Sequence, residues 1–247
     1  MREPICIEFE DVVAGYGELV VLNHLSLRAS RSKITLLIGP NGAGKSTALK
    51  TLFGLLRVRS GRIRLDGDDI TGAAPRDLLI RHGVAFVPQG RNLFGQLSVY
   101  ENLELGGITL GTKTARERIP EVVERFECVK HRLHSAAASL SGGEQKQLEI
   151  ARALLLRPKV LLIDEPSVGL SPLAVLEVFR MLRALADAET TVLIVEQNVR
   201  SALALADEAI ALESGRQVLH RRAEDLLGDP ELERLFLGGA RGAGPIP

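Results

Sequence analysis

The sequence predicts an α/β fold with a mainly parallel sheet, an antiparallel β layer on its N-terminal side, and a helical subdomain inserted between two strands of the core. Three observations predict it. Four short segments consist almost entirely of apolar residues, as do strands buried on both faces of a parallel sheet. Three N-terminal segments alternate apolar and polar residues, as half-buried antiparallel strands do. The stretch near residues 89–158 has helical periodicity and no strand-like apolar run.

The alternating segments come first along the chain, and the last of them ends at an Asp66-Gly67 turn. Their inward-facing residues are expected to be Ile5, Ile7, Phe9, Leu25, Leu27, Ala29, Ile63 and Leu65. The apolar runs are Ile34–Ile38, Val84–Val87, Val160–Ile163 and Thr191–Val195.

Helices are predicted between these strands from apolar stripes with a period near 3.6 residues. Ser171-Pro172 supplies an N-cap and a first helical residue for the third of them. The stripes are Ala48, Leu49, Leu52 and Phe53; Leu148, Ala151, Leu154 and Leu155; and Leu173, Leu176, Phe179, Leu182 and Leu185. We therefore expect one domain over residues 1–237, in which 1–88 and 159–237 form the core and 89–158 the helical subdomain, followed by a flexible tail at 238–247.

Charge, cysteine content and the length of the apolar runs argue against several classes of function. The 247 residues carry 31 Lys and Arg against 31 Asp and Glu, so no nucleic-acid partner is expected, and the mixed charges of 113–130 favour a solvated helix face. Cys6 and Cys128 lie far apart and form no zinc-site pattern. The apolar runs fall far short of the ~18 residues of a membrane helix. With no signal-peptide core, we expect a soluble protein that stays inside the cell.

A phosphate-binding loop is predicted directly after the apolar run Ile34–Ile38. Gly39-Pro40-Asn41-Gly42-Ala43-Gly44-Lys45-Ser46-Thr47 fits the pattern GxxxxGK[ST], with an apolar strand before it and a helix after it. The glycines allow backbone N–H groups to surround phosphate oxygens at a helix N-terminus. Lys45 would add a full positive charge, and the hydroxyl of Ser46 would reach Mg²⁺. The core is thus predicted to be a P-loop nucleotide-binding core.

Two adjacent carboxylates, Asp164 and Glu165, end the strand at 160–163. Such a pair is costly at a buried strand end without a positive partner. Mg²⁺ held by Ser46 and Asp164 would supply that partner, and Glu165 would orient or deprotonate the water that attacks the γ-phosphate. By itself the pair is also consistent with two solvated acids, but the upstream phosphate loop favours the catalytic interpretation.

A second anion-binding element is predicted at Leu140-Ser141-Gly142-Gly143-Glu144, before the helix that contains Leu148. Ser141 and Glu144 also match a capping box, which is the purely structural alternative. A capping box needs no Gly-Gly, however, and the glycines free N–H groups at a helix N-terminus. One nucleotide needs only one phosphate loop. A second element that binds the γ-phosphate therefore implies that two chains share each nucleotide.

These three motifs, in this order, resemble the Walker A, signature and Walker B motifs of the ATP-binding subunits of ABC transporters, and the likeness extends to about Phe236. The resemblance implies ATP and Mg²⁺ as ligands. It further implies that Tyr16 stacks on adenine, although an edge or core tyrosine is the alternative. Gln89 matches the glutamine that contacts Mg²⁺ and the attacking water. The resemblance also implies that Ser167–Pro172 contacts a second ATPase subunit in a homo- or heterodimer.

The usual switch histidine is replaced by Gln197, within Val195-Glu196-Gln197-Asn198. We expect Gln197 to act by hydrogen bonding alone, because an amide does not titrate near neutral pH; the alternative is that it caps the strand end or the next helix. This segment and Val87–Phe94 resemble the shorter ATPase of bacterial branched-chain amino-acid importers, and related urea and amide importers look similar. The resemblance implies transmembrane permease partners, indirectly a periplasmic binding protein, and a cytoplasmic place on the inner face of the membrane.

Two other functions compete with this one. Soluble ABC proteins that act on DNA or ribosomes resemble pairs of ATPase units in tandem, or carry zinc-binding inserts or long coiled coils. This sequence has one ATPase unit, no cysteine cluster and no heptad run. A GTPase or small-molecule kinase would share the phosphate loop but would leave Leu140–Glu144 unexplained, and no Asn-Lys-x-Asp guanine reader is found.

Overall fold

The structure is a computed structural model that describes residues 4–90 and 92–227, so the tail predicted at 238–247 lies outside the described residues. The strands are β1 (Ile5–Tyr16), β2 (Leu19–Ser30), β3 (Ile34–Ile38), β4 (Val58–Leu65), β5 (Asp68–Asp69), β6 (Val84–Val87), β7 (Val160–Asp164), β8 (Thr191–Val195), β9 (Glu208–Glu213) and β10 (Arg216–Arg222). The α-helices are α1 (Lys45–Leu52), α2 (Pro75–Ile80), α3 (Val99–Gly106), α4 (Thr112–Val123), α5 (Glu127–Lys130), α6 (Gly142–Leu154), α7 (Pro172–Asp187) and α8 (Val199–Leu203). Short 3-10 turns are η1 (Ile108–Leu110), η2 (Ala137–Ser139) and η3 (Glu224–Leu226).

The central sheet has the strand order β10-β9-β3-β8-β7-β6, and only the β9–β10 pair among its described strands is antiparallel. The four apolar runs of the sequence are its strands β3, β6, β7 and β8. Side chains alternate between its faces: Leu36 and Ile163 pack into the cluster that contains α6 and α7, whereas Leu37 and Leu162 pack toward the other sheet. Burial on both faces explains why these strands show no polar alternation.

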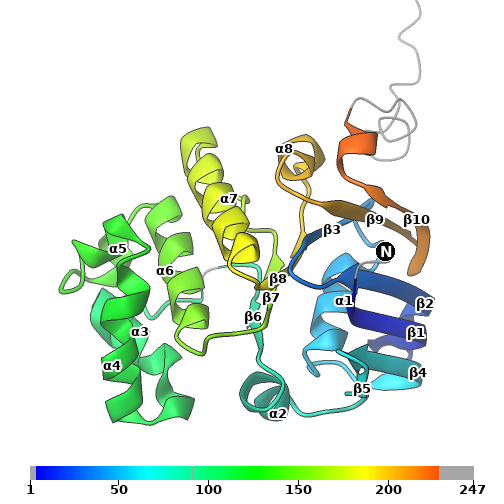
Figure 1. Ribbon diagram of the computed structural model, residues 1–247, viewed down its shortest axis with the longest axis horizontal. Coiled ribbons are helices and arrows are strands. Elements are labelled where there is room, and N and C mark those ends of the chain that lie inside the picture. Colours follow the sequence, from blue (N-terminus) through cyan, green and yellow to red (C-terminus); the bar gives the residue numbers. More distant parts are fainter. Residues whose placement is uncertain (1–3, 91, 228–247) are drawn as a thin grey trace, which may run out of the picture.

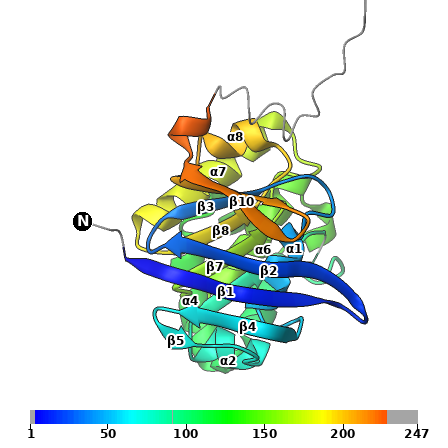
Figure 2. The same cartoon turned by 90° about the vertical axis from the view of Figure 1, so that its right-hand side faces the viewer.

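The second sheet is antiparallel, in the order β2-β1-β4-β5, and lies across the first as a separate layer (Figure 2). Its predicted alternation is confirmed except at the start of β1, where Cys6 is buried and Ile5 is exposed. The register with β2 shifts between Ile5 and Ile7, and such an irregularity reverses which side chain faces the core.

Helices occupy both faces of the central sheet. Figure 1 shows α1 on the side of β1 and β2, with α6 and α7 on the opposite side; accordingly Leu49 of α1 and Leu148 of α6 belong to different core clusters. The predicted stripe of α7 is wrong at its first two positions, because Leu173 is 66% exposed and Leu176 is 51% exposed. Leucines spaced by three drift about 60° per step around a helix. The four leucines and Phe179 of the stripe therefore cannot share one face, and Val175 and Val178 enter the core instead.

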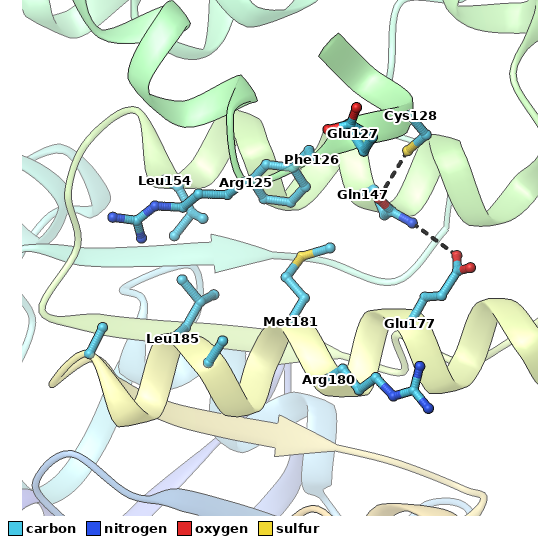
Figure 3. A pocket seen from close by; sticks show the side chains of 12 residues that line it. Arg125, Phe126, Glu127, Cys128, Gln147, Leu154, Glu177, Arg180, Met181 and Leu185 are labelled. Atoms are coloured by element: carbon cyan, nitrogen blue, oxygen red, sulfur yellow. Dashed lines mark hydrogen bonds between the residues drawn. The ribbon is translucent and has the colours of Figure 1, made fainter. Parts of the chain in front are cut away.

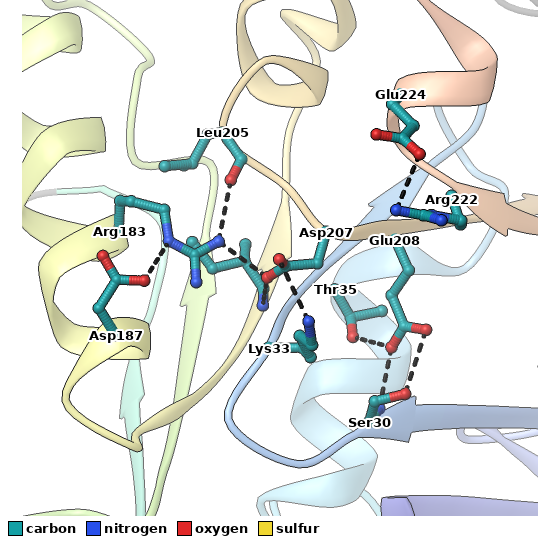
Figure 4. A network of polar contacts seen from close by, with 11 residues as sticks. Ser30, Lys33, Thr35, Arg183, Asp187, Leu205, Asp207, Glu208, Arg222 and Glu224 are labelled. Carbon is teal, nitrogen blue, oxygen red and sulfur yellow. Dashed lines mark hydrogen bonds and ion pairs between the residues drawn. The ribbon is translucent and has the colours of Figure 1, made fainter. Parts of the chain in front are cut away.

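Between β6 and β7, the described residues form helices α3 to α6 with short turns and one isolated bridge, Ser98 to Ala136. At the other end of the sheet, polar contacts tie the last strands to the core (Figure 4). Glu208 of β9 accepts hydrogen bonds from the Ser30 N–H at 2.9 Å and the Thr35 hydroxyl at 2.7 Å. None of the described helices is long and apolar enough to cross a bilayer.

Candidate functional site

The loop at 39–44 joins β3 to α1 and has the backbone conformation that its glycines permit. Gly39, Gly42 and Gly44 all have positive φ angles, of 151°, 83° and 101°. A Cβ at Gly39 would lie 2.3 Å from the carbonyl oxygen of Leu212, whereas one at Gly42 would meet open space. No side chain of the described residues caps α1, which begins at Lys45. The N–H groups of its first turn therefore remain available to an anion.

The turn between β9 and β10 supports this loop, a contact that the sequence did not predict. Gly215 donates its N–H to the carbonyl of Ala43 at 3.0 Å, and its carbonyl accepts the N–H of Asn23 at 3.0 Å. The left-handed Ser214-Gly215 pair between two strands was the available signal. Tyr16 lies at the turn end of the β1–β2 hairpin, opposite Leu19, and is 44% exposed.

Lys45 curls back over the loop. Its Nζ donates hydrogen bonds to the carbonyl oxygens of Gly39 at 2.8 Å and Pro40 at 3.1 Å. Burial lowers the pKa of Lys45, and the charges of Glu165 and Asp164 act in the opposite direction. The buried ammonium is thus held at the loop with two carboxylates near it.

Ser46 and Asp164 lie together, as predicted. The Ser46 hydroxyl donates to Oδ1 of Asp164 at 2.8 Å. Burial raises the pKa of Asp164, the hydrogen bond from Ser46 lowers it, and the charge of Glu165 raises it. A hydroxyl and a buried carboxylate beside a phosphate loop are hard oxygen donors of the kind that Mg²⁺ accepts, so the residues present fit this ion.

Glu165 is held by two amides. Its φ is 49°, a left-handed conformation that is unusual for a residue other than glycine. Nε2 of Gln89 donates to Oε2 of Glu165 at 2.5 Å, and Nε2 of Gln197 donates to Oε1 at 2.7 Å. The three residues predicted to be catalytic therefore come together from the ends of β6, β7 and β8.

The segment 141–144 forms the capping box: the Glu144 N–H donates to the Ser141 hydroxyl at 3.4 Å, and the Ser141 N–H donates to Oε2 of Glu144 at 2.7 Å. These hydrogen bonds at Ser141 lower the pKa of Glu144, partly offset by burial. Gly142 and Glu165 line a common cavity of about 370 Å³, but no described residue of 39–47 does. Because α1 and α6 cover opposite faces of the sheet, the phosphate loop and the 141–144 segment of one chain do not meet there.

A larger cavity of about 650 Å³ lies between α5, α6 and α7 (Figure 3). Phe126, Met181 and Leu185 form much of its apolar lining, and Cys128 donates to Oε1 of Gln147 at 2.9 Å at one end. None of the predicted site residues lines this cavity, so size alone does not identify the functional site.

Comparison with known proteins identifies the family. Residues 22–168 match the ABC transporter family model. The chain belongs to the ABC transporter family. The ATP-binding protein BraG for high-affinity branched-chain amino acid transport in Pseudomonas aeruginosa is 41% identical over 94% of this chain and 100% of its own length. LivF of Archaeoglobus fulgidus, a probable branched-chain amino acid transport ATP-binding protein, is 38% identical over 91% of this chain and 95% of LivF.

Other members of the family are also close to this ABC ATPase. LptB of Escherichia coli, the ATP-binding protein of a lipopolysaccharide export system, is 36% identical over 93% of this chain and 95% of LptB. The solved structure of MJ1267 in its ADP conformation superposes with a TM-score of 0.86 and 28% identity, covering 95% of this chain and 99% of that one. The fold predicted from sequence is confirmed, and the chain is the ATP-hydrolysing subunit of a transporter.

Proposed function

We propose that this chain powers an importer of branched-chain amino acids, and that ATP is bound by 39–47 and Tyr16 and cleaved at Glu165. The single observation that carries the site is the meeting of Gln89, Glu165 and Gln197 next to the Ser46–Asp164 pair. BraG and LivF, which serve branched-chain amino acid transport, support the substrate class.

The role that we give each residue follows from its position in the site. Loop N–H groups and Lys45 bind phosphate oxygens, and the half-exposed ring of Tyr16 stacks on the base. Glu165 orients and deprotonates the attacking water, a role that contributes roughly 10²–10⁴-fold to rate. Gln89 and Gln197 aim its carboxylate through their amide groups.

Mg²⁺ would be held by Ser46 and Asp164, with Gln89 as a further oxygen ligand. When bound, the ion neutralises charge on the phosphate oxygens. The Gln89 amide nitrogen donates to Glu165 here, and its oxygen is the atom available to the ion. Ser46 already points its hydroxyl oxygen toward the same region as Asp164.

A second ATPase subunit would complete each nucleotide site with its residues 141–144. Ser141, Gly142, Gly143 and Glu144 lie away from the phosphate loop of their own chain, on the other face of the sheet. The exposed apolar side chains Val168 and Leu173, next to this segment, favour a partner surface there. The rate per chain should therefore rise with concentration, and a fast, concentration-independent monomer would contradict the shared site.

Permease subunits would convert closure and opening of this dimer into transport. A groove between α2, β6 and α6, with Leu79 and Phe86 in its lining, lies next to Gln89 and offers apolar surface for a permease helix. In this proposal residues 89–158 form the helical subdomain that contains the 140–144 motif, and the chain lies in the cytoplasm on the inner face of the membrane. A periplasmic binding protein would act only indirectly.

The substrate is tested by assembling the chain with its permease subunits and binding protein in proteoliposomes. Leucine, isoleucine or valine should stimulate ATP hydrolysis, and Glu165→Gln should abolish the stimulated rate. Stimulation by urea or amides instead would assign the related importers. Assembly only with lipopolysaccharide-export components would favour the role that LptB has, and association with ribosomes or DNA would favour a soluble ABC protein.

A further inference from the structure

Glu196 directly follows β8, and its side chain has no exposed surface. Its two carboxylate oxygens are both occupied. Oε1 accepts the N–H of Ser167 at 2.7 Å, and Oε2 accepts the Ser167 hydroxyl at 2.7 Å and the N–H of Gln197 at 3.1 Å. Burial raises the pKa of Glu196, and these hydrogen bonds lower it. A buried carboxylate is costly without such donors, so its position is closely determined by them.

These contacts join the chain after β7 to the chain after β8. The N–H of Glu165 donates to the carbonyl of Val195 at 2.9 Å. Glu196 then holds Ser167, and Gln197 reaches back to the Glu165 carboxylate at 2.7 Å. Residues 195 and 197 therefore contact Glu165, and Glu196 between them contacts Ser167. A shift of the loop after β7 would displace the loop after β8, and the reverse.

The loop that Glu196 holds leads to the surface. Val168 is exposed and lines the same cavity as Glu165, and Ser171 caps α7 at the end of the loop. The loop that Glu196 holds therefore connects the surroundings of Glu165 with the exposed surface.

We propose that Glu196 is a positioning residue that locks the Ser167 loop to Gln197 and thereby sets the orientation of the Glu165 carboxylate for hydrolysis. The inference rests on the proposed function of Glu165. If Glu196 served stability alone, its loss would lower the melting temperature and leave the rate per folded molecule unchanged.

The test is a double-mutant cycle on the full-length chain, measured as single-turnover hydrolysis at saturating MgATP together with ATP affinity. Glu196→Gln places an NH₂ group against an N–H donor, so hydrolysis should slow by about 10–100-fold, the scale of a small misplacement, with ATP affinity within about twofold. In a Gln197→Ala background, the same change should cost little more, because Glu196 acts through Gln197. Glu208→Gln is the matched control: it alters a partly buried carboxylate that has several donors and lies outside the site, and it should leave the rate unchanged.

Equal losses in both backgrounds, or a normal rate for folded Glu196→Gln, would overturn the proposal. Should Glu196→Gln not fold, Ser167→Ala removes a single donor and is tested in the same two backgrounds, with an expected slowing of about threefold that vanishes beside Gln197→Ala. Glu165→Gln separates the two hypotheses. Normal hydrolysis by that variant refutes the proposed site, whereas lost hydrolysis there with a normal Glu196→Gln refutes the positioning role alone.

Discussion

Replacing Glu165 by Gln should stop hydrolysis while preserving ATP binding. The carboxylate accepts one amide hydrogen bond on each oxygen, from Gln89 at 2.5 Å and Gln197 at 2.7 Å. A carboxamide keeps the shape but offers a single acceptor oxygen and no basic site. Lys45 and Ser46 keep their contacts, so the phosphate-binding surface is unchanged.

The magnitudes decide which effect dominates. Loss of a general base costs about 10²–10⁴ in rate, which is about 3–5 kcal/mol at 1.36 kcal/mol per tenfold. Both amide contacts change from charged to neutral, provided that the amide facing the new NH₂ group turns its oxygen toward it. Each change costs about 1 kcal/mol, because a bond to a charged group contributes about 1.5–3 kcal/mol and a neutral one about 0.5–1.5 kcal/mol. The chemical loss therefore exceeds the structural one. ATP affinity should be equal or slightly higher, because one negative charge near Lys45 is removed.

Single-turnover hydrolysis, nucleotide titration and gel filtration with ATP measure these effects separately. The variant should bind ATP, hydrolyse it at least about 100-fold more slowly, and elute as a dimer that persists. Glu117→Gln, on the exposed side of α4, is the control for a lost surface charge. Wild-type turnover by Glu165→Gln, or failure to dimerise with ATP, would refute the role given to this carboxylate.

Four further predictions test neighbouring parts of the site and fold. Lys45→Ala should weaken ATP binding by about 10–100-fold, from one lost charged hydrogen bond, as measured by calorimetry; unchanged affinity would exclude Lys45 from phosphate binding. Gln197→Ala should slow single-turnover hydrolysis on melting-matched protein, while Gln197→His should be tolerated and add a pH dependence near ~6–7; an unaffected alanine variant would end the catalytic interpretation. Gly39→Ala should lower the melting temperature and abolish nucleotide binding, because the new Cβ would lie 2.3 Å from a carbonyl oxygen. Gly42→Ala meets open space and should cost only about 1–2 kcal/mol of backbone strain. Equal losses of melting temperature in the two variants would contradict this difference. Burial raises the pKa of Glu208, but hydrogen bonds outweigh it and hold that pKa below its usual range. The contribution of Glu208 to stability is therefore present above about pH 4.3 and is lost as the pH falls through the folded-state pKa. Glu208→Gln should flatten this acid-dependent loss in urea unfolding, and an unchanged pH profile would refute the prediction.

Local patterns predicted most of the fold, and long-range packing accounts for what they missed. The burial of β3, β6, β7 and β8 and the cap at Ser171 follow from neighbouring residues alone. The exposure of Leu173 depends on how the angular drift of the leucines meets the sheet, and the burial of Cys6 depends on a register shift against β2. Neither is encoded within a few residues of the position concerned.

The site shows the same division. Glycine spacing predicted the phosphate loop, because each glycine serves a local backbone need, but its support by Gly215 joins residues far apart in sequence. The motif order identified Gln89 and Glu165 separately. That Gln89 donates a hydrogen bond to Glu165, which also accepts one from Gln197, follows only from parallel strands ending at one edge of the sheet. The role of Glu196 was not predicted, since a glutamate after a strand carries no signal of burial.

The use of two amides around Glu165 has a chemical consequence. An amide N–H orients a carboxylate without offsetting its charge, whereas a cation in the same place would neutralise the base that it positions. Gln89 and Gln197 together occupy both oxygens while adding no titratable group. The lone pair that accepts the proton of water must then be one that the amides leave unoccupied, and Glu165 lines the cavity shared with Gly142. Glu165 thus keeps its negative charge for the attacking water, while the two amides set the orientation of its carboxylate.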